Sequence, residues 1–246
     1  MQIEDNHLSH EDNLVIQSHL KPFLASYDNL SRLSAAEVST LPYPDLTSLI
    51  PTAPPHEIAE LRNHLIARYW IAARHSNQYS RPTLSELDIR SLSVIVNRDT
   101  GAEDLYRLSW GRRLKLGDYR AVPIQVKSTP LRVFPYPREV PALMERFCQW
   151  LSEEDKKETH QHPVVMACQA VIYFVSIHPF PDGNGRVSRL IMQDLLMRAG
   201  YVPPVIELEG REDYIGLIRE ASEGNAGRWV GRVVRAVEEG LLGLKR

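Results

Sequence analysis

The sequence has few cysteines, no long apolar run and almost no net charge, and each shortage excludes a class of protein. Only two cysteines occur in 246 residues, Cys148 and Cys168, and no metal-ligand spacing links them. Both lie in apolar helical patterns, so we expect buried thiols rather than a disulfide. The longest apolar run, from Val164 to Ile177, is shorter than the roughly 20 residues that a membrane helix needs. A formal net charge of −2 gives no electrostatic reason to expect nucleic acid or a membrane as partner.

What is present is the composition of an ordinary globular protein, with 43% hydrophobic and 24% charged residues. The first residues, MQIEDNHLSHEDN, are acidic and polar, unlike a secretory signal. We therefore expect a cytoplasmic protein. The length suits one large domain or one domain with an extension.

Apolar residues recur at helical spacing along the first third of the chain. Residues 14–24 and 35–41 are expected to form helices, and the proline-rich stretch at 41–55 is expected to be a connector. A strong amphipathic helix is predicted to start after this connector. Its buried stripe is expected to contain Ile58, Leu61, Leu65, Tyr69 and Ala72 or Ala73. Arg62, Arg68 and Arg74 are expected to lie mostly outside this stripe. The pattern from Thr83 to Glu86 resembles a capping box, which predicts a helix through about Val96.

The middle of the chain carries its only β signal. The runs GDYRAVPIQV and PLRVFPYP are bracketed by prolines and predict a short two-stranded hairpin. Helical spacing returns afterwards at 140–151, 163–177, 187–198, 211–220 and 228–239. A short helical piece is also expected at 105–110. The predicted class is all-α with one hairpin.

The loop at 178–189, HPFPDGNGRVSR, combines residue types that phosphate transfer needs. Gly183 and Gly185 allow close backbone approach to a ligand, and with Asn184 and the following helix start they predict a nest of N–H donors for an anion. Asp182 offers a hard oxygen ligand for Mg²⁺.

Three further side chains of this loop suit the same chemistry. Arg186 and Arg189 are three residues apart and are expected to share a helix face. His178 can accept a proton near neutral pH. Each feature alone also has a structural explanation, because a histidine at a helix end, a Gly-Asn-Gly turn and an arginine pair are common. The functional interpretation depends on their joint occurrence in one loop.

These twelve residues resemble the signature of the Fic family, H-x-F-x-[DE]-G-N-G-R-x-x-R, at every fixed position. The run GDYRAVPIQV is similar to the flap of that family, and EVPALMERFCQWL to the helix that follows the flap. The run VPPVIELEGREDYIGLIREASEGN resembles the segment after the signature helix. The resemblance covers roughly residues 83 to 240.

The resemblance implies a Fic-type helical bundle with a short β-hairpin flap and an N-terminal helical extension. It divides the chain into an extension with its connector at 1–54, a helix and inhibitory segment at 55–82, and a catalytic domain at 83–246. It also implies a Mg-dependent protein adenylyltransferase, which transfers AMP from ATP to a Ser, Thr or Tyr hydroxyl of a target protein and releases pyrophosphate.

The resemblance further assigns roles to single residues. His178 would deprotonate the target hydroxyl, and Asp182 would hold Mg²⁺ against the phosphates. The phosphates would be bound by Gly183, Asn184, Gly185, Arg186 and Arg189. Phe180 would pack under the loop. Tyr214 and Ile215 match positions that line the adenine pocket, and the flap residues that would dock the target are Ile124, Gln125, Val126 and Lys127.

Many members of the family carry an inhibitory helix, [ST]-x-x-x-E-[GN], upstream of a T-L-x-E segment. This chain has Thr83-Leu84-Ser85-Glu86, and counting back places Gln78 where the inhibitory glutamate would stand. A neutral Gln78 lacks the charge-assisted pair with Arg189, so we predict weak autoinhibition. Alternatively, this stretch is simply a helix end.

Other functions remain open at this stage. The same fold could move another nucleotide or phospho-group, or remove AMP from a modified protein, although Gln78 argues against removal. From a different class, the chain could be a catalytically silent binding module. The residues do not identify the target protein, and they leave the oligomeric state open, with a homodimer among the options.

Overall fold

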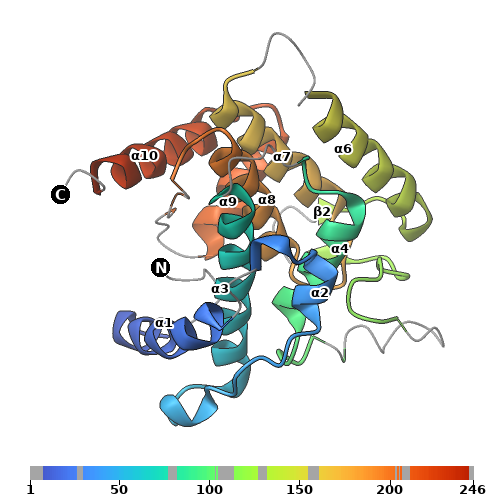
Figure 1. Cartoon of the computed structure of the whole chain (residues 1–246). Helices are drawn as coiled ribbons and strands as arrows, with labels where there is room; N and C mark the ends of the chain where they lie inside the picture. The colour runs from blue at the N-terminus through green and yellow to red at the C-terminus, as the bar shows by residue number, and fades with distance from the viewer. Residues whose placement is uncertain are drawn as a thin grey trace.

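The computed structural model describes residues 8–26, 30–76, 82–102, 104, 114–126, 132–154, 161–202, 204, 206 and 211–243. Helices dominate this part of the chain, as predicted (Figure 1). They are α1 (His10–Ala25), α2 (Ala35–Ser39), α3 (Pro55–Ser76), α4 (Glu86–Asn97), α6 (Val140–Glu154), α7 (Pro163–Ile177), α8 (Asn184–Arg198), α9 (Arg211–Ser222) and α10 (Gly227–Gly243). The strands are β1 (Gln125–Val126) and β2 (Arg132–Val133).

The start of α4 differs from the prediction. Its capping box is formed by Ser85 and Asp88, not by Thr83 and Glu86. The Ser85 hydroxyl accepts from the Asp88 N–H at 3.1 Å, and the Asp88 carboxylate accepts from the Ser85 N–H at 3.0 Å. An aspartate can close the box as well as a glutamate, so the helix begins two residues later than the Thr83 pattern implied.

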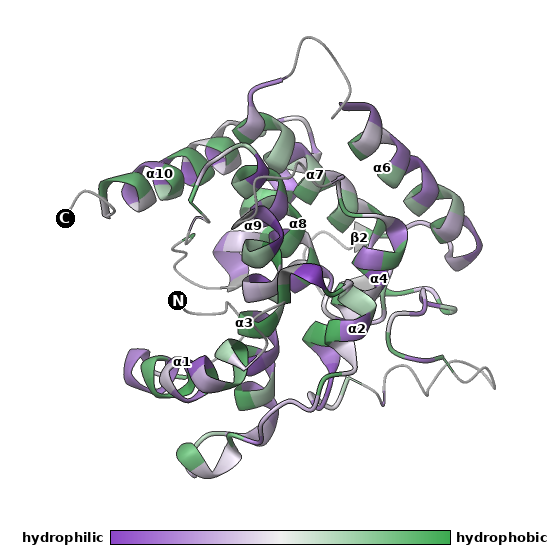
Figure 2. Ribbon diagram, viewed as in Figure 1, coloured by the Kyte–Doolittle hydropathy of each residue, from purple (hydrophilic) through white to green (hydrophobic). Residues whose placement is uncertain are grey.

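The core is organised around α7, which is apolar on nearly all sides. Helix α8 runs back along α7, and α6, α9 and α10 also pack against it. Helix α3 packs on α8, α4 and α1, so it joins the N-terminal helices to the rest of the molecule (Figure 1). The more peripheral α6 and α10 show separate hydrophilic and hydrophobic bands in Figure 2, as expected for helices that bury one face.

Helix α3 is buried more completely than its amphipathic pattern predicted. Ile58 and Leu61 are buried as expected, but Tyr69, which was assigned to the buried stripe, is 41% exposed. Conversely, Arg62 and Arg74 were expected outside the stripe and are only 7% and 5% exposed. The reason is that α3 has neighbours on several sides, so its polar residues are buried with partners.

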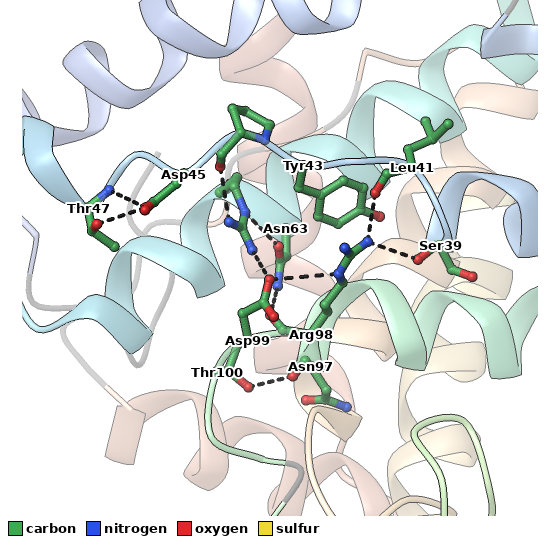
Figure 3. A network of polar contacts seen from close by, with 12 residues as sticks. Ser39, Leu41, Tyr43, Asp45, Thr47, Asn63, Asn97, Arg98, Asp99 and Thr100 are labelled. Atoms are coloured by element: carbon green, nitrogen blue, oxygen red, sulfur yellow. Dashed lines mark hydrogen bonds and ion pairs between the residues drawn. The ribbon is translucent and has the colours of Figure 1, made fainter.

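A polar network fastens the N-terminal segment to the end of α4 (Figure 3). Arg98, which follows α4, donates to the carbonyl oxygen of Leu41 at 2.7 Å, and its guanidinium lies 4.5 Å from the ring centre of Tyr43. Arg62 of α3 binds the Asp99 carboxylate at 2.9 Å. The network thus fixes the carboxyl end of α4 between α3 and the N-terminal segment.

The hairpin is present where the sequence predicted it. Strands β1 and β2 are antiparallel, with Gln125 opposite Val133 and Val126 opposite Arg132. Each strand has only two residues, and a hairpin of this size is marginal in water on its own. It is therefore expected to depend on the helical body for its position.

Both cysteines are free, as predicted. Cys168 is buried and Cys148 is half-buried, and this burial raises the pKa of each thiol to about 12. In the described part of the chain, no helix combines the length and the apolar character required to span a membrane.

Several predictions concern residues outside the described part of the chain. They include the helical piece at 105–110, the flap residue Lys127 and the candidate inhibitory position Gln78. The division at residues 54 and 82 stays a prediction. One hydrophobic cluster includes side chains from all three predicted segments, such as Leu20, Trp70 and Phe174.

Candidate active site

His178 caps the carboxyl end of α7 in a left-handed conformation, with φ 51° and ψ 60°. Its N–H donates to the Phe174 carbonyl oxygen at 3.0 Å, which completes the last helical turn. The imidazole packs against the ring of Phe134, just after β2, with ring centres 4.3 Å apart. The base predicted from the sequence therefore lies beside the hairpin.

The loop after His178 is stabilised by hydrogen bonds between a side chain and the main chain of the same loop. The Asn184 side chain accepts from the Phe180 N–H at 3.0 Å and donates to the Phe180 carbonyl oxygen at 2.8 Å. Phe180 is fully buried and packs near Tyr119 and Phe174. The amide of Asn184 thus shapes the loop, which leaves its backbone N–H, at the first position of α8, for the predicted anion nest.

Gly183 is the N-cap of α8 and has a φ of 77°. A Cβ at this position would lie 2.7 to 3.1 Å from the side-chain atoms of Asn97, a fully buried residue at the end of α4. The Asn97 amide donates to the Asp182 carbonyl oxygen at 3.1 Å. Both the backbone conformation and the close approach of α4 therefore require glycine here.

Arg186 is 5% exposed and has partners on three elements. It donates to the Val96 carbonyl oxygen at 3.2 Å and to the Asn97 side chain at 3.1 Å. It also pairs with Asp182 at 3.2 Å and with Glu60 of α3 at 3.1 Å. These contacts tie the loop to α3 and α4.

Arg189 faces a different neighbour from Arg186, although both lie on α8. Its guanidinium lies 5.5 Å from the ring centre of Tyr214 on α9. Tyr214 is buried, with its hydroxyl 3.5 Å from the Ser188 hydroxyl, and Ile215 beside it is half-buried. The predicted phosphate ligand Arg189 and the predicted adenine-pocket residue Tyr214 are thus neighbours.

Positive charge gathers where α3 meets α8. His64 of α3 is 3% exposed. Burial lowers the pKa of His64 well below its usual value, and the charges of Arg189, Arg68 and Arg186 lower it further. His64 is therefore neutral at pH 7, and it feels the charges of three arginines, of which Arg186 is paired with Asp182 and Glu60. Such a concentration of positive charge favours a polyanionic ligand.

A magnesium ion would find one suitable carboxylate in the loop. The Asp182 side chain is 42% exposed, so solvent and ligands can reach it, and it precedes the amino end of α8. Among the described residues, no three His, Cys, Asp or Glu side chains form a closed metal-binding group. This arrangement fits Mg²⁺, which proteins often hold through one carboxylate together with substrate phosphates and water.

The flap residues are partly described. Ile124 is half-buried, and Gln125 and Val126 form β1. The hairpin lies close to the base, since Phe134 contacts His178. The predicted base therefore lies next to the hairpin that contains the predicted docking strand β1, and the contact comes from the segment after β2.

The loop and its surroundings match a known family. Residues 83–196 match the Fic/DOC family. They form a Fic domain. The Protein adenylyltransferase Fic of Drosophila grimshawi is 39% identical to this chain over 125 residues, which are 51% of this chain and 25% of that protein. The match thus spans only a quarter of the relative's length.

Solved structures share the fold over nearly the whole chain. A Fic-1 fragment from C. elegans has a TM-score of 0.63 at 22% identity, covering 97% of this chain and 67% of that one. A Fic domain containing signaling protein from Bacteroides thetaiotaomicron has a TM-score of 0.59 at 23% identity, covering 95% of this chain and 85% of that one. The predicted Fic fold is confirmed.

Four residues of the candidate site were not singled out from the sequence: Asn97, Glu60, Arg120 and Phe134. Asn97 and Glu60 contact Arg186 from α4 and α3, and the other two support His178. No local pattern marks them, because each acts across a long sequence separation. For Asn97 and Glu60 the available signal was a polar residue within an otherwise apolar helical pattern, and Arg120 and Phe134 carry no such signal.

Proposed function

We propose that the chain is a protein adenylyltransferase, which transfers AMP from ATP to a Ser, Thr or Tyr hydroxyl of another protein. The observation that carries the proposal is the joint position of His178 and the amino end of α8. One loop places an imidazole beside the hairpin and a row of N–H groups beside clustered arginines. The curated relatives are named for this activity, over the quarter of their length that matches.

The phosphates of ATP would bind at the amino end of α8. The N–H groups of Asn184, Gly185 and Arg186 have no acceptor inside the helix, and the helix dipole favours an anion there. Arg189, half-buried beside Tyr214, would bind the terminal phosphates and bring the nucleotide base towards the α9 side. Tyr214 and Ile215 would then contact adenine.

Arg186 would have to release one of its present partners before it could bind a phosphate. Its guanidinium already contacts Glu60 and Asp182. To bind a phosphate directly, Arg186 would exchange one of these carboxylates for phosphate oxygens. Glu60 comes from outside the loop, so we expect it to be the partner that is exchanged.

Asp182 would hold Mg²⁺ together with the phosphates. The bound ion would offset phosphate charge, including the charge that builds up on the leaving pyrophosphate. Arg186 contacts one oxygen of Asp182 at 3.2 Å, which orients the carboxylate. The partial exposure of Asp182 leaves it accessible to the incoming nucleotide.

His178 would act as the general base. The target hydroxyl oxygen attacks the α-phosphorus of ATP, a new phosphorus–oxygen bond forms, and the bond to the β-phosphate oxygen breaks. The hydroxyl proton passes to the imidazole of His178, and pyrophosphate leaves. The target segment would be presented by the flap, where Ile124 to Lys127 can pair with an extended peptide through the main chain.

The test is a labelling experiment with four nucleotides. Protein and cell lysate are incubated with Mg²⁺ and α-labelled ATP, CTP, GTP or UTP. Wild type should label protein from ATP in preference to the others. The His178→Ala variant should lose the label by about 10² to 10⁴-fold, the usual contribution of a general base. His56→Ala, at an exposed histidine of α3, is the matched control. Absence of label from every nucleotide would overturn the proposal.

A further inference from the structure

Arg120 joins the end of α7 to both sides of the hairpin. The residue is 2% exposed, and its Nε donates to the His178 carbonyl oxygen at 2.7 Å. One terminal nitrogen donates to the carbonyl oxygens of Ile177, at 3.4 Å, and Pro135. The Arg120 N–H donates to the Pro179 carbonyl oxygen at 2.9 Å. Arg120 precedes β1 and Pro135 follows β2, so one guanidinium links the helix end to the whole hairpin.

The contacts of Arg120 are unusual for a buried charge. The acceptors of its guanidinium are main-chain carbonyl oxygens, and within the described part of the chain no carboxylate pairs with it. A buried cation without a counter-ion costs stability, and an apolar side chain would fill the space at a lower penalty. A planar guanidinium can, however, orient several carbonyl groups at once. This points to an orienting role.

The group that most needs orienting is His178. Its left-handed backbone is strained for a residue other than glycine, so the surroundings must hold it in place. Arg120 binds the carbonyl oxygen of His178 and that of Pro179, and Phe134 packs on the imidazole. Backbone and ring are therefore both held by the segments that flank β1 and β2.

We propose that Arg120 is a positioning residue for the adenylyl transfer. It locks the backbone of His178 to the hairpin, so that a target hydroxyl docked on the hairpin meets the imidazole in a fixed geometry. This inference rests on the proposed role of His178 as base. Among the described residues, no hydrogen bond joins the guanidinium of Arg120 to Asp182, Arg186 or Arg189. We therefore expect the affinity for ATP to change little when Arg120 is replaced.

The kinetic test separates the rate from nucleotide binding. Self-modification of the full chain is followed with α-labelled ATP and Mg²⁺ for wild type, Arg120→Met and Arg120→Lys. Arg120→Met should lower the maximum rate by about 10²-fold, the effect of displacing a catalytic group by about 1 Å. The half-saturating ATP concentration should stay within about twofold. Arg120→Lys keeps the positive charge but lacks the planar guanidinium, so its maximum rate should lie between those of wild type and Arg120→Met.

Arg90→Met is the matched control. Arg90 holds the same segment slightly upstream, through the Gly117 carbonyl oxygen and the Asp118 carboxylate, both at 2.9 Å, without touching His178. It should keep a rate close to wild type. An equal loss of rate in Arg90→Met, or a loss in Arg120→Met that appears only as weaker ATP binding, would overturn the inference.

A second readout needs no activity. In protein labelled with ¹³C-histidine and free of nucleotide, the His178 imidazole signal is assigned with His178→Gln. The His178 imidazole signal should shift in both Arg120 variants and should stay in place in Arg90→Met. An unchanged signal in folded Arg120→Lys would overturn the inference even if wild type is a transferase. If wild type labels nothing, the proposed function fails, while a shift confined to the Arg120 variants still supports the positioning role.

Discussion

Replacing Gly183 by alanine tests whether the loop at 178–189 packs directly against α4. Two costs are expected. The φ of 77° costs about 1–2 kcal/mol for alanine. The new Cβ would also lie 2.7 Å from the Asn97 side chain. Asn97 is fully buried and bonded to Asp182 and Arg186, so it cannot move aside freely, and the overlap should cost about a further 1–3 kcal/mol.

Gly200→Ala separates these two costs. Gly200 has a φ of 85°, close to that of Gly183, but nothing lies within 4 Å of its would-be Cβ. It should therefore lose only the conformational part. In urea denaturation, Gly183→Ala should be less stable than Gly200→Ala by about 1–3 kcal/mol. In thermal unfolding this is a difference of about 2–4 °C per kcal/mol.

The double variant with Asn97→Ala identifies the clash. Once the Asn97 side chain is removed, Gly183→Ala should cost about as much as Gly200→Ala, so the cycle shows a favourable coupling. Equal destabilisation by Gly183→Ala and Gly200→Ala, with no coupling to Asn97, would refute the close contact between the loop and α4.

Two further predictions concern α3. Glu60→Gln should lower stability by about 1–3 kcal/mol, because the buried Arg186 loses a charged partner, and should tighten ATP binding in calorimetry. Glu145→Gln, at an exposed site of α6, should change neither the stability nor the affinity for ATP. An unchanged stability and an unchanged ATP affinity in Glu60→Gln would contradict the exchange of Glu60 for phosphate. Because the pKa of His64 is lowered in the folded protein, the imidazole of His64 is protonated only in the unfolded chain as the pH falls below about 6.5. The free energy of unfolding of wild type should therefore fall by up to about 1.4 kcal/mol per pH unit below this pH through His64. Urea unfolding from pH 7.5 to 5 measures this slope, which His64→Gln should lack in part and His56→Gln should keep. Identical slopes in wild type and both variants would refute the prediction.

The sequence was sufficient for the helices, the hairpin and the place of the loop. A nearly continuous apolar run marks α7, because residues on most of its faces are buried or half-buried. Prolines and turn residues mark the ends of β1 and β2. The start of α4 was misplaced because Thr83 and Ser85 both begin acceptable capping patterns, and only the folded backbone selects Ser85.

The environment of α3 could not be read from its pattern. Periodicity detects one apolar stripe, whereas α3 has neighbours on several sides. Arg62 and Arg74 are buried beside distant carboxylates, which are those of Asp99 at 2.9 Å and Asp194 at 3.6 Å. Pairs of this kind join residues far apart in the chain, so a local pattern does not reveal them.

The candidate site divides in the same way. The residues of the loop are close in sequence, so their grouping could be predicted. Asn97 and Arg120, which help to hold the loop, lie 85 and 58 residues from the residues that they contact, Asp182 and His178. The flap could be located, but its contact with His178 through Phe134 required the fold.

We propose that His178 helps to move the α-phosphoryl group of ATP, with its nucleoside, onto a protein hydroxyl. The most direct measurement compares α-labelled and γ-labelled ATP in parallel reactions with Mg²⁺ and lysate, followed by mass analysis of the labelled protein. We expect the label that depends on His178 to come from the α-position alone, with an added AMP on a Ser, Thr or Tyr, and we expect both to be lost in His178→Ala. Label carried from the γ-position, or labelling that persists without His178, would contradict it.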